Sequence, residues 1–205
     1  ILHTNLGRSM LSECVKENLM NTLFNYTNLE FDIEQKARGT RCSHLESIIK
    51  KLTGAEDVLV VNNNAAAVML VLNTLARDRE IVVSRGELVE IGGSFRIPEI
   101  IKLSGGILCE IGTTNKTHLK DYANAINEKT AALFKVHTSN YKIVGFSKEV
   151  SNKEVVNLAH ENNIIAISDL GSGQFLDLRP YGLTYEPTVK EVIDSGMDIV
   201  MFSGD

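Results

Sequence analysis

The chain has 205 residues, of which 43% are hydrophobic and 23% charged, with 15 glycines and 3 prolines. This composition excludes disordered, collagen-like and low-complexity classes, and the length is enough for one domain with a sizeable core. Lys and Arg number 21 against 26 Asp and Glu, so the net charge is −5. Because the sequence has no basic run, this balance argues against a nucleic-acid clamp within the segment.

Neither membrane insertion nor a metal framework is indicated by the sequence. The longest apolar stretch, residues 65–72, is too short to cross a bilayer, and no cationic leader precedes an apolar core. The three cysteines, Cys14, Cys42 and Cys109, are scattered, which favours a reducing compartment and no metal site. We therefore expect a cytoplasmic protein without a bound metal.

Short apolar runs alternate with longer amphipathic segments along the chain. In chain order we expect a helix over 11–24, a helix that a capping box opens at Ser43 and Gly54 stops, a strand over 58–61, and a buried helix over 65–76 capped by Asn64. Further strands follow over 81–84, 106–111, 131–136, 164–169 and 198–202. Capping boxes at Ser151 and Thr188 open the helices before the last two strands.

This alternation predicts an α/β fold, a mainly parallel sheet with crossover helices. Several strands are apolar throughout, as expected for strands that are covered on both faces. For the domain organisation, we expect an N-terminal arm and helix over residues 1–25 and one large domain over residues 26–205.

Three asparagines and three alanines, residues 62–67, directly follow the first expected strand. Ligands of open α/β sheets collect outside the carboxyl ends of the strands. Small side chains let an anion reach the free N–H groups of a helix N-terminus, where the helix dipole favours negative charge. The run Asn62-Asn63-Asn64 therefore predicts a phosphate cradle; the alternative is an ordinary helix cap, for which one Asn is enough.

Asp169 ends another apolar run and precedes the turn Gly171-Ser172-Gly173. A buried carboxylate needs a partner, either a protein donor or a bound cation. The functional interpretation is a carboxylate that faces a protonated ring nitrogen, and the alternative is an Asp that caps a turn. The last strand ends in Ser203-Gly204, which puts a small hydroxyl at the same edge of the sheet.

Other polar side chains follow other expected strands. Arg85 and Glu87 come after one strand, and His137 and Asn140 after another. Each alone is more often structural, but their shared rim favours a site. Arg8, before the first helix, could meet an anion or only solvent. The sequence contains no G-x-G-x-x-G or G-x-S-x-G motif, which disfavours a dinucleotide-binding fold and a hydrolase.

The asparagine run, Asp169 and Ser203 together resemble the arrangement of fold-type I pyridoxal-phosphate enzymes. Longer blocks are similar to the bacterial selenocysteine synthase family, the L-seryl-tRNA(Sec) selenium transferases. These blocks cover residues 3–8, 59–64, 84–96, 112–115 and 135–140. The resemblance implies the incomplete large domain of such a transferase, with its Schiff-base lysine expected immediately after Asp205.

The resemblance also implies roles around the cofactor, pyridoxal 5'-phosphate. Its phosphate would be held by Asn62, Asn63, Asn64 and Ser203. Asp169 would keep the ring nitrogen protonated, so that the ring can accept electrons. Asn140 would reach the ring hydroxyl.

On the substrate side, the resemblance implies that Arg8 binds the anionic selenium donor. Related enzymes stack a ring on the cofactor just after the second strand, but the sequence there is Arg85-Gly86-Glu87, without an aromatic residue. Arg85, Glu87 and His137 are therefore possible substrate or ring contacts.

The implied reaction converts seryl-tRNA(Sec) into selenocysteinyl-tRNA(Sec), by elimination of the seryl hydroxyl and addition of selenium from selenophosphate. The family implies a homo-oligomer with active sites between subunits and a tRNA held largely outside this segment. One alternative is a related pyridoxal-phosphate lyase or ammonia-lyase that acts on a small amino acid or amino sugar without tRNA, which the net charge of −5 favours. A second alternative is a non-catalytic anion-binding domain.

Overall fold

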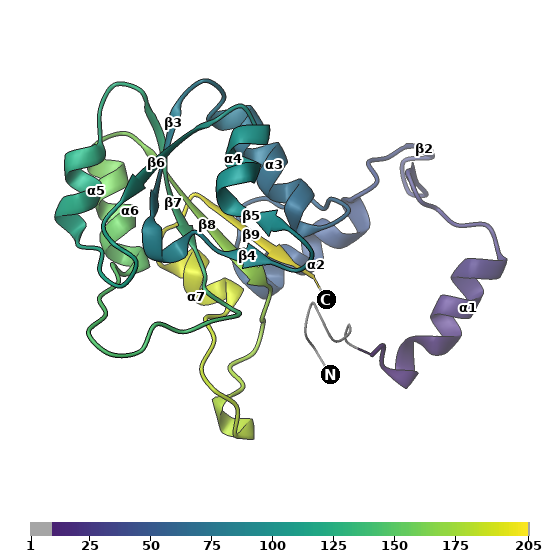
Figure 1. Cartoon of the computed structure of the whole chain (residues 1–205). Coiled ribbons are helices and arrows are strands. Elements are labelled where there is room, and N and C mark those ends of the chain that lie inside the picture. The colour runs from purple at the N-terminus through teal and green to yellow at the C-terminus, as the bar shows by residue number, and fades with distance from the viewer. Residues whose placement is uncertain (1–9, 205) are drawn as a thin grey trace. The chain divides into compact units, whose positions relative to one another are not determined.

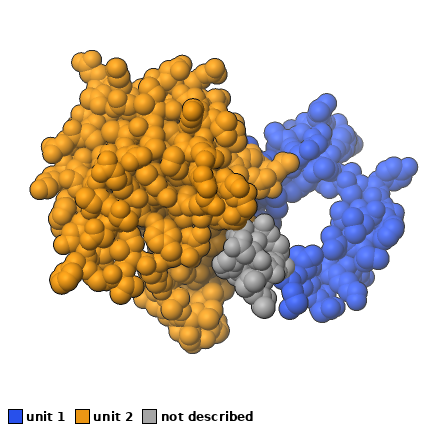
Figure 2. All heavy atoms as spheres, viewed as in Figure 1, with its two compact units in different colours: residues 1–60, 205 blue, residues 61–204 orange. Residues whose placement is uncertain are grey.

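The structure is a computed structural model that describes residues 10–204 (Figure 1). The chain divides into two compact units, residues 1–60 with residue 205, and residues 61–204 (Figure 2). The predicted division into residues 1–25 and 26–205 stays a prediction. All the candidate site residues that the structure describes belong to the second unit.

The described part of the first unit consists of short helices and one small hairpin. Its elements are η1 (Glu13–Val15), α1 (Lys16–Phe24), β1 (Phe31–Asp32), β2 (Ala37–Arg38) and α2 (Ser43–Thr53), and β1 pairs with β2 in the antiparallel sense. The helix predicted over residues 11–24 is confirmed from residue 13, with a 3-10 first turn. Gly54 ends α2 with a φ of 80°, a left-handed conformation that suits glycine.

The capping box predicted at Ser43 is wrong. Ser43 is already the first residue of α2, its N-cap residue is Cys42, and no side chain caps the helix. The Ser43 hydroxyl donates instead to the carbonyl of Thr40 at 2.9 Å. Local hydrogen bonds of this kind compete with capping, so the sequence pattern located the start of the helix but not its cap.

The strand predicted over residues 58–61 is also wrong, because no strand in the described part of the chain pairs with it. Leu59 and Val60 are 70% and 40% exposed. An apolar run indicates burial, but a strand also needs a neighbour for its N–H and C=O groups. Residues 58–61 are apolar, but no described strand lies beside them to pair with their backbone groups.

The second unit contains a five-stranded parallel sheet in the order β6-β3-β7-β8-β9. Its strands are β3 (Glu80–Ser84), β6 (Ile107–Ile111), β7 (Thr130–Val136), β8 (Ile165–Ser172) and β9 (Ile199–Ser203). They confirm the five strands predicted after residue 80, although β8 continues to Ser172. The α/β fold class is therefore confirmed. Smaller elements are η2 (Arg85–Glu87), the pair β4 (Glu90–Ile91) and β5 (Phe95–Arg96), and η3 (Arg179–Tyr181).

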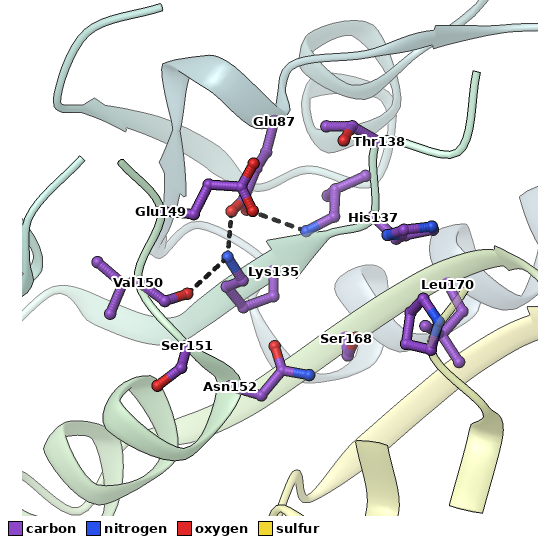
Figure 3. Close-up of a pocket in the computed structure, with 12 residues that line it drawn as sticks. Glu87, Lys135, His137, Thr138, Glu149, Val150, Ser151, Asn152, Ser168 and Leu170 are labelled. Carbon is purple, nitrogen blue, oxygen red and sulfur yellow. Dashed lines mark hydrogen bonds and ion pairs between the residues drawn. The ribbon is translucent and has the colours of Figure 1, made fainter. Parts of the chain in front are cut away.

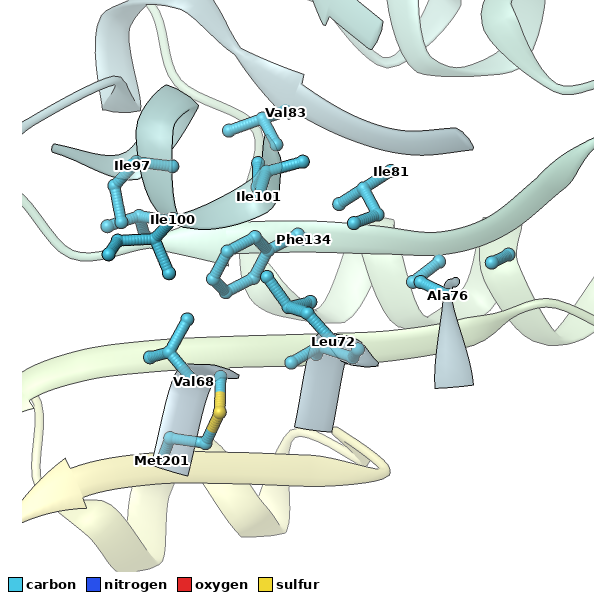
Figure 4. Packing of buried hydrophobic residues seen from close by; sticks show 14 of the residues in the cluster. Val68, Leu72, Ala76, Ile81, Val83, Ile97, Ile100, Ile101, Phe134 and Met201 are labelled. Carbon is cyan, nitrogen blue, oxygen red and sulfur yellow. The ribbon is translucent and has the colours of Figure 1, made fainter. Parts of the chain in front are cut away.

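Helices cover both faces of this sheet (Figure 1). On one face, α3 (Asn64–Leu75) and α4 (Ile97–Leu103) pack with the strands around Phe134 (Figure 4). On the other face, α5 (Leu119–Ala125), α6 (Asn152–Glu161) and α7 (Val189–Asp194) pack around Leu133. None of the described helices is both long and apolar enough to cross a membrane.

Two of the predicted capping boxes are confirmed, those at the starts of α6 and α7. The Ser151 side chain accepts a hydrogen bond from the Glu154 N–H, and the Thr188 side chain accepts one from the Glu191 N–H. In each box the Glu side chain accepts from the N–H of the capping residue. These reciprocal bonds satisfy donors that a helix start otherwise leaves unpaired.

Successive side chains of a strand point to opposite faces of a sheet. On β8, Ile167 packs in the cluster with α3 and α4, whereas Ala166 and Leu170 belong to the cluster with α5, α6 and α7. By the same alternation, Asp169 faces α3 and Ser168 faces α6. The two faces of the sheet therefore carry different polar side chains at the carboxyl edge.

Candidate functional site

Asp169 lies near the carboxyl end of β8 and is fully buried. Its Oδ1 accepts two hydrogen bonds, from Asn64 Nδ2 at 2.7 Å and from the Gly171 N–H at 2.9 Å. Its Oδ2 is buried and has no hydrogen-bond partner among the described residues. Burial raises the pKa of Asp169, because the buried carboxylate loses its hydration. A donor or cation at Oδ2 would therefore stabilise the charged form.

The asparagine run lies where the chain enters α3. Asn63 is the N-cap residue, with an extended backbone and a side chain that accepts from the Ala66 N–H at 2.9 Å. The prediction that Asn64 caps this helix is wrong by one residue, because Asn64 is already helical and its amide contacts Asp169. The N–H groups of Asn64 and Ala65 have no acceptor within the described residues. These two N–H groups can therefore donate hydrogen bonds to an anion at the positive end of the helix dipole.

Ser203 ends β9 and is paired with Ser172 in the register between β8 and β9. The N–H of Gly173 donates to the Ser203 carbonyl at 2.9 Å. A Cβ atom on Gly173 would come within 2.7 Å of this carbonyl oxygen, closer than a side chain tolerates. Glycine therefore permits the turn after β8 to pack directly against the end of β9.

A polar pocket of about 400 Å³ lies on the face of the sheet covered by α6 (Figure 3). It contains a buried ion pair between Glu87 of η2 and Lys135 of β7. Lys135 Nζ also donates to the Val150 carbonyl at 3.1 Å, and the other Glu87 oxygen accepts from the Val136 N–H at 3.1 Å. Burial raises the pKa of Glu87, and the positive charge of Lys135 opposes that rise.

Other polar groups of this pocket come from β8, from the segment that follows β7, and from the start of α6 with the residues before it. Ser168 is buried, and Asn152 lies beside it, whereas Glu149 lies near Glu87 in the pocket lining (Figure 3). Lys135 is not among the site residues predicted from the sequence. The available signal was a lysine that follows four apolar residues, 131–134, in the strand Thr130–Val136. Buried lysines are rare unless they are paired.

Two further candidates connect β7 to neighbouring loops. His137 lines the same pocket, and its Nε2 lies 2.5 Å from a carboxylate oxygen of Glu186. Asn140 is exposed, and its amide donates to the Glu90 carbonyl at 2.9 Å. Both side chains therefore have protein partners in addition to any role toward a ligand.

Arg85 is exposed and contacts the end of β6. Its guanidinium donates to the Glu110 carboxylate at 3.1 Å and to the Gly112 carbonyl at 2.9 Å. Arg8 lies outside the described residues. Within those residues, no group of three or more His, Cys, Asp or Glu side chains is placed to hold a metal ion.

Five of the predicted site residues fall into two sets. Asn63, Asn64 and Asp169 come together on the α3 face, with a buried oxygen left for a ligand. Glu87 and His137 line the pocket on the α6 face.

One family model, described as L-seryl-tRNA selenium transferase, matches residues 1–205. The chain belongs to this family. The predicted membership of the selenium transferase family is therefore confirmed. Curated selenium transferases include one from Alkaliphilus oremlandii that is 60% identical and one from Clostridium botulinum strain Loch Maree that is 56% identical, both over 205 residues. These alignments cover 100% of this chain but only 44% of each relative.

Solved structures similar to this chain share its fold. D-glucosaminate-6-phosphate ammonia-lyase matches with a TM-score of 0.74 and 23% identity, over 98% of this chain and 52% of that one. A Thermus thermophilus aspartate aminotransferase mutant matches with a TM-score of 0.54 and 16% identity, over 88% of this chain and 45% of that one. These neighbours confirm the predicted fold of the fold-type I pyridoxal-phosphate enzymes.

Proposed function

We propose that this chain is the cofactor-binding part of an L-seryl-tRNA(Sec) selenium transferase that uses pyridoxal 5'-phosphate. The reaction converts seryl-tRNA(Sec) into selenocysteinyl-tRNA(Sec) with selenium from selenophosphate. The family match over the whole chain supports this function. The observation that carries it in the structure is the buried Oδ2 of Asp169, which has no hydrogen-bond partner in the part of the chain that the structure describes.

The surroundings of Asp169 fit a protonated pyridine nitrogen. An N–H donor at Oδ2 would satisfy the unpartnered oxygen, and its positive charge would offset the burial that raises the pKa of Asp169. When bound, pyridoxal phosphate supplies an electron sink that stabilises negative charge at the reacting carbon of the substrate. Asp169 supports this chemistry by holding a proton on the ring nitrogen.

The N-terminus of α3 fits the cofactor phosphate. The N–H groups of Asn64 and Ala65 lack acceptors within the described residues, and the small side chain of Ala65 permits a close approach. We assign Asn62, Asn63 and Ser203 to the same phosphate, and we assign Asn140 to the ring hydroxyl.

The remaining roles belong to the same proposal. Arg8 binds the anionic selenium donor, because a planar guanidinium can hold a phosphate group with two parallel hydrogen bonds. Arg85, Glu87 and His137 lie on the substrate side, and the lysine that carries the cofactor follows Asp205. The protein acts in the cytoplasm as a homo-oligomer with active sites between subunits.

The test is an assay of the full-length protein with pyridoxal phosphate, seryl-tRNA(Sec) and selenophosphate. The expected product is selenocysteinyl-tRNA(Sec), formed only when the cofactor is present. Ammonia released from a small amino acid or amino sugar, without any reaction on tRNA, would replace this proposal with a lyase. Binding of inorganic phosphate without binding of pyridoxal phosphate would replace it with a non-catalytic anion-binding domain.

A further inference from the structure

The amide of Asn64 joins the N-terminus of α3 to the carboxylate of Asp169, 105 residues later in the chain. We propose that Asn64 is a positioning residue that holds Asp169 Oδ1, so that Oδ2 is presented to the ring nitrogen of the cofactor. This inference rests on the proposed function, and it gives the Asn64 side chain a role different from phosphate binding.

The hydrogen bonds of Asp169 fix the plane of its carboxylate. Two groups, Asn64 Nδ2 and the Gly171 N–H, donate to Oδ1. Gly171 belongs to the same strand as Asp169, so Asn64 is the donor that ties the carboxylate to a second element, the helix α3. Rotation of the carboxylate out of its plane would weaken both hydrogen bonds. The bond from Asn64 therefore holds the orientation of Oδ2.

Asn64 also affects the charge of Asp169. Burial raises the pKa of Asp169, whereas the hydrogen bond from Asn64 lowers it, followed by smaller contributions from the Gly171 N–H and His137. An ionised Asp169 is what holds a proton on a ring nitrogen, because the two opposite charges stabilise each other. Asn64 therefore favours the charge state that the site needs.

The orientation of the Asn64 amide follows from the same contact. Reversing the amide would place its oxygen against Asp169 Oδ1, and two acceptors would then face each other. With the nitrogen toward Asp169, the Asn64 Oδ1 is buried and has no partner among the described residues. Two acceptors without a partner in residues 10–204, Asn64 Oδ1 and Asp169 Oδ2, thus belong to one hydrogen-bonded pair. Buried polar groups left unpaired are costly, which favours a bound molecule that brings donors to this place.

The experiment compares Asn64→Ala and Asn64→Asp with the wild-type, full-length protein. The matched control is Asn73→Ala in the same helix, because the Asn73 amide donates to the Ser104 carbonyl at 3.0 Å, away from Asp169. Two quantities are measured: the dissociation constant of pyridoxal phosphate, and the ¹⁵N chemical shift of ring-labelled cofactor across a pH series, which reports protonation of the ring nitrogen.

We expect Asn64→Ala to weaken cofactor binding by about tenfold and to lower the pH at which the ring nitrogen loses its proton. Asn64→Asp should also weaken cofactor binding, because the amide donor to Asp169 Oδ1 is lost and the two facing carboxyl groups would share one proton with each other. Asn73→Ala should match the wild type in both measurements.

Three other outcomes would count against one proposal or the other. If the wild-type protein does not bind pyridoxal phosphate, the proposed function fails. If the wild type binds it and the ring nitrogen titrates identically in Asn64→Ala, the positioning role fails. If Asn64→Ala only lowers the melting temperature, with an unchanged nitrogen titration, Asn64 is purely structural and the inference is overturned.

Discussion

Lys135 and Glu87 form an ion pair between β7 and η2, and their side chains are only 11% and 7% exposed. Glu87 is held from two sides, because it also accepts from the Val136 N–H. The pair ties the turn that follows β3 to the neighbouring strand. It also fixes one wall of the pocket on the α6 face.

The first prediction is that Lys135→Met destabilises the protein by about 3–5 kcal/mol, because it leaves the Glu87 carboxylate buried without a partner. Urea unfolding measures this change. The double variant Glu87→Leu/Lys135→Met should recover much of the loss, because no buried charge remains unpaired. The control is Lys190→Met, which breaks an exposed ion pair with Asp194 and should cost less than about 1 kcal/mol. A similar, small cost for both single variants would contradict the importance of the buried pair.

The second prediction concerns Asp169 in the cofactor-free protein. Between the ordinary pKa of 3.8 and the raised pKa of the folded state, the folded protein keeps a proton that the unfolded chain has released. The free energy of unfolding therefore falls as pH rises through this window. Asp169→Asn should weaken this pH dependence, because the titrating group is removed. With the cofactor bound, the same variant should lower the proposed selenium transfer by about 100-fold or more, because the protonated ring loses its counter-charge.

Urea unfolding across a pH series checks this second prediction. Glu87 changes stability in the same direction, because burial also raises its pKa, so part of the pH dependence should persist in the variant. The control is Asp78→Asn, a change at an exposed aspartate, which should leave the wild-type pH dependence intact. An unchanged slope in Asp169→Asn would show that Asp169 releases its proton at its ordinary pH in the fold.

The third prediction tests the cap of α3. Asn63→Ala should lower the free energy of unfolding by about 1 kcal/mol, because the Ala66 N–H loses its acceptor. Asn63→Ser should stay close to the wild type, since a serine side chain can accept the same hydrogen bond. Chemical denaturation of the three proteins side by side distinguishes these cases, and equal stability of Asn63→Ala and wild type would refute the cap.

The fourth prediction concerns the turn after β8. Gly173→Ala should destabilise the protein by about 1–3 kcal/mol, because the new Cβ would approach the Ser203 carbonyl and the Phe202 ring too closely. Gly93→Ala is the matched control, because a Cβ there meets nothing within 4 Å. Thermal unfolding should show a lower melting temperature for Gly173→Ala alone.

Most local features of this fold were predictable from the sequence, apart from the Ser43 cap and the strand over residues 58–61, and long-range contacts were not. The strands β3, β6, β7, β8 and β9 were found because each is a short apolar run, and the boxes at Ser151 and Thr188 because their partners lie three residues away. The contact of Lys135 with Glu87 spans 48 residues and depends on how η2 lies against β7. No local pattern contains that information.

The candidate site shows the same division. The asparagine run and Asp169 were identified as polar groups at strand ends, which is a local property. The direction of the Asn64 amide depends on how the start of α3 packs against β8, and the local sequence suggested a cap instead. The predicted capping residue, Asn64, was wrong by one residue. Each of three consecutive asparagines can cap a helix, and the backbone conformation determines that Asn63 does so.

The register of β8 against β7 pairs Ser168 with Lys135 and Asp169 with Val136. A slip of one residue would turn every side chain of β8 to the other face of the sheet. Asp169 would then lie next to Lys135 and compete with Glu87 for its charge, while Asn64 would lose its carboxylate. The polar contacts Asn64–Asp169 and Glu87–Lys135 therefore favour the observed register of β8 over one that is shifted by a residue.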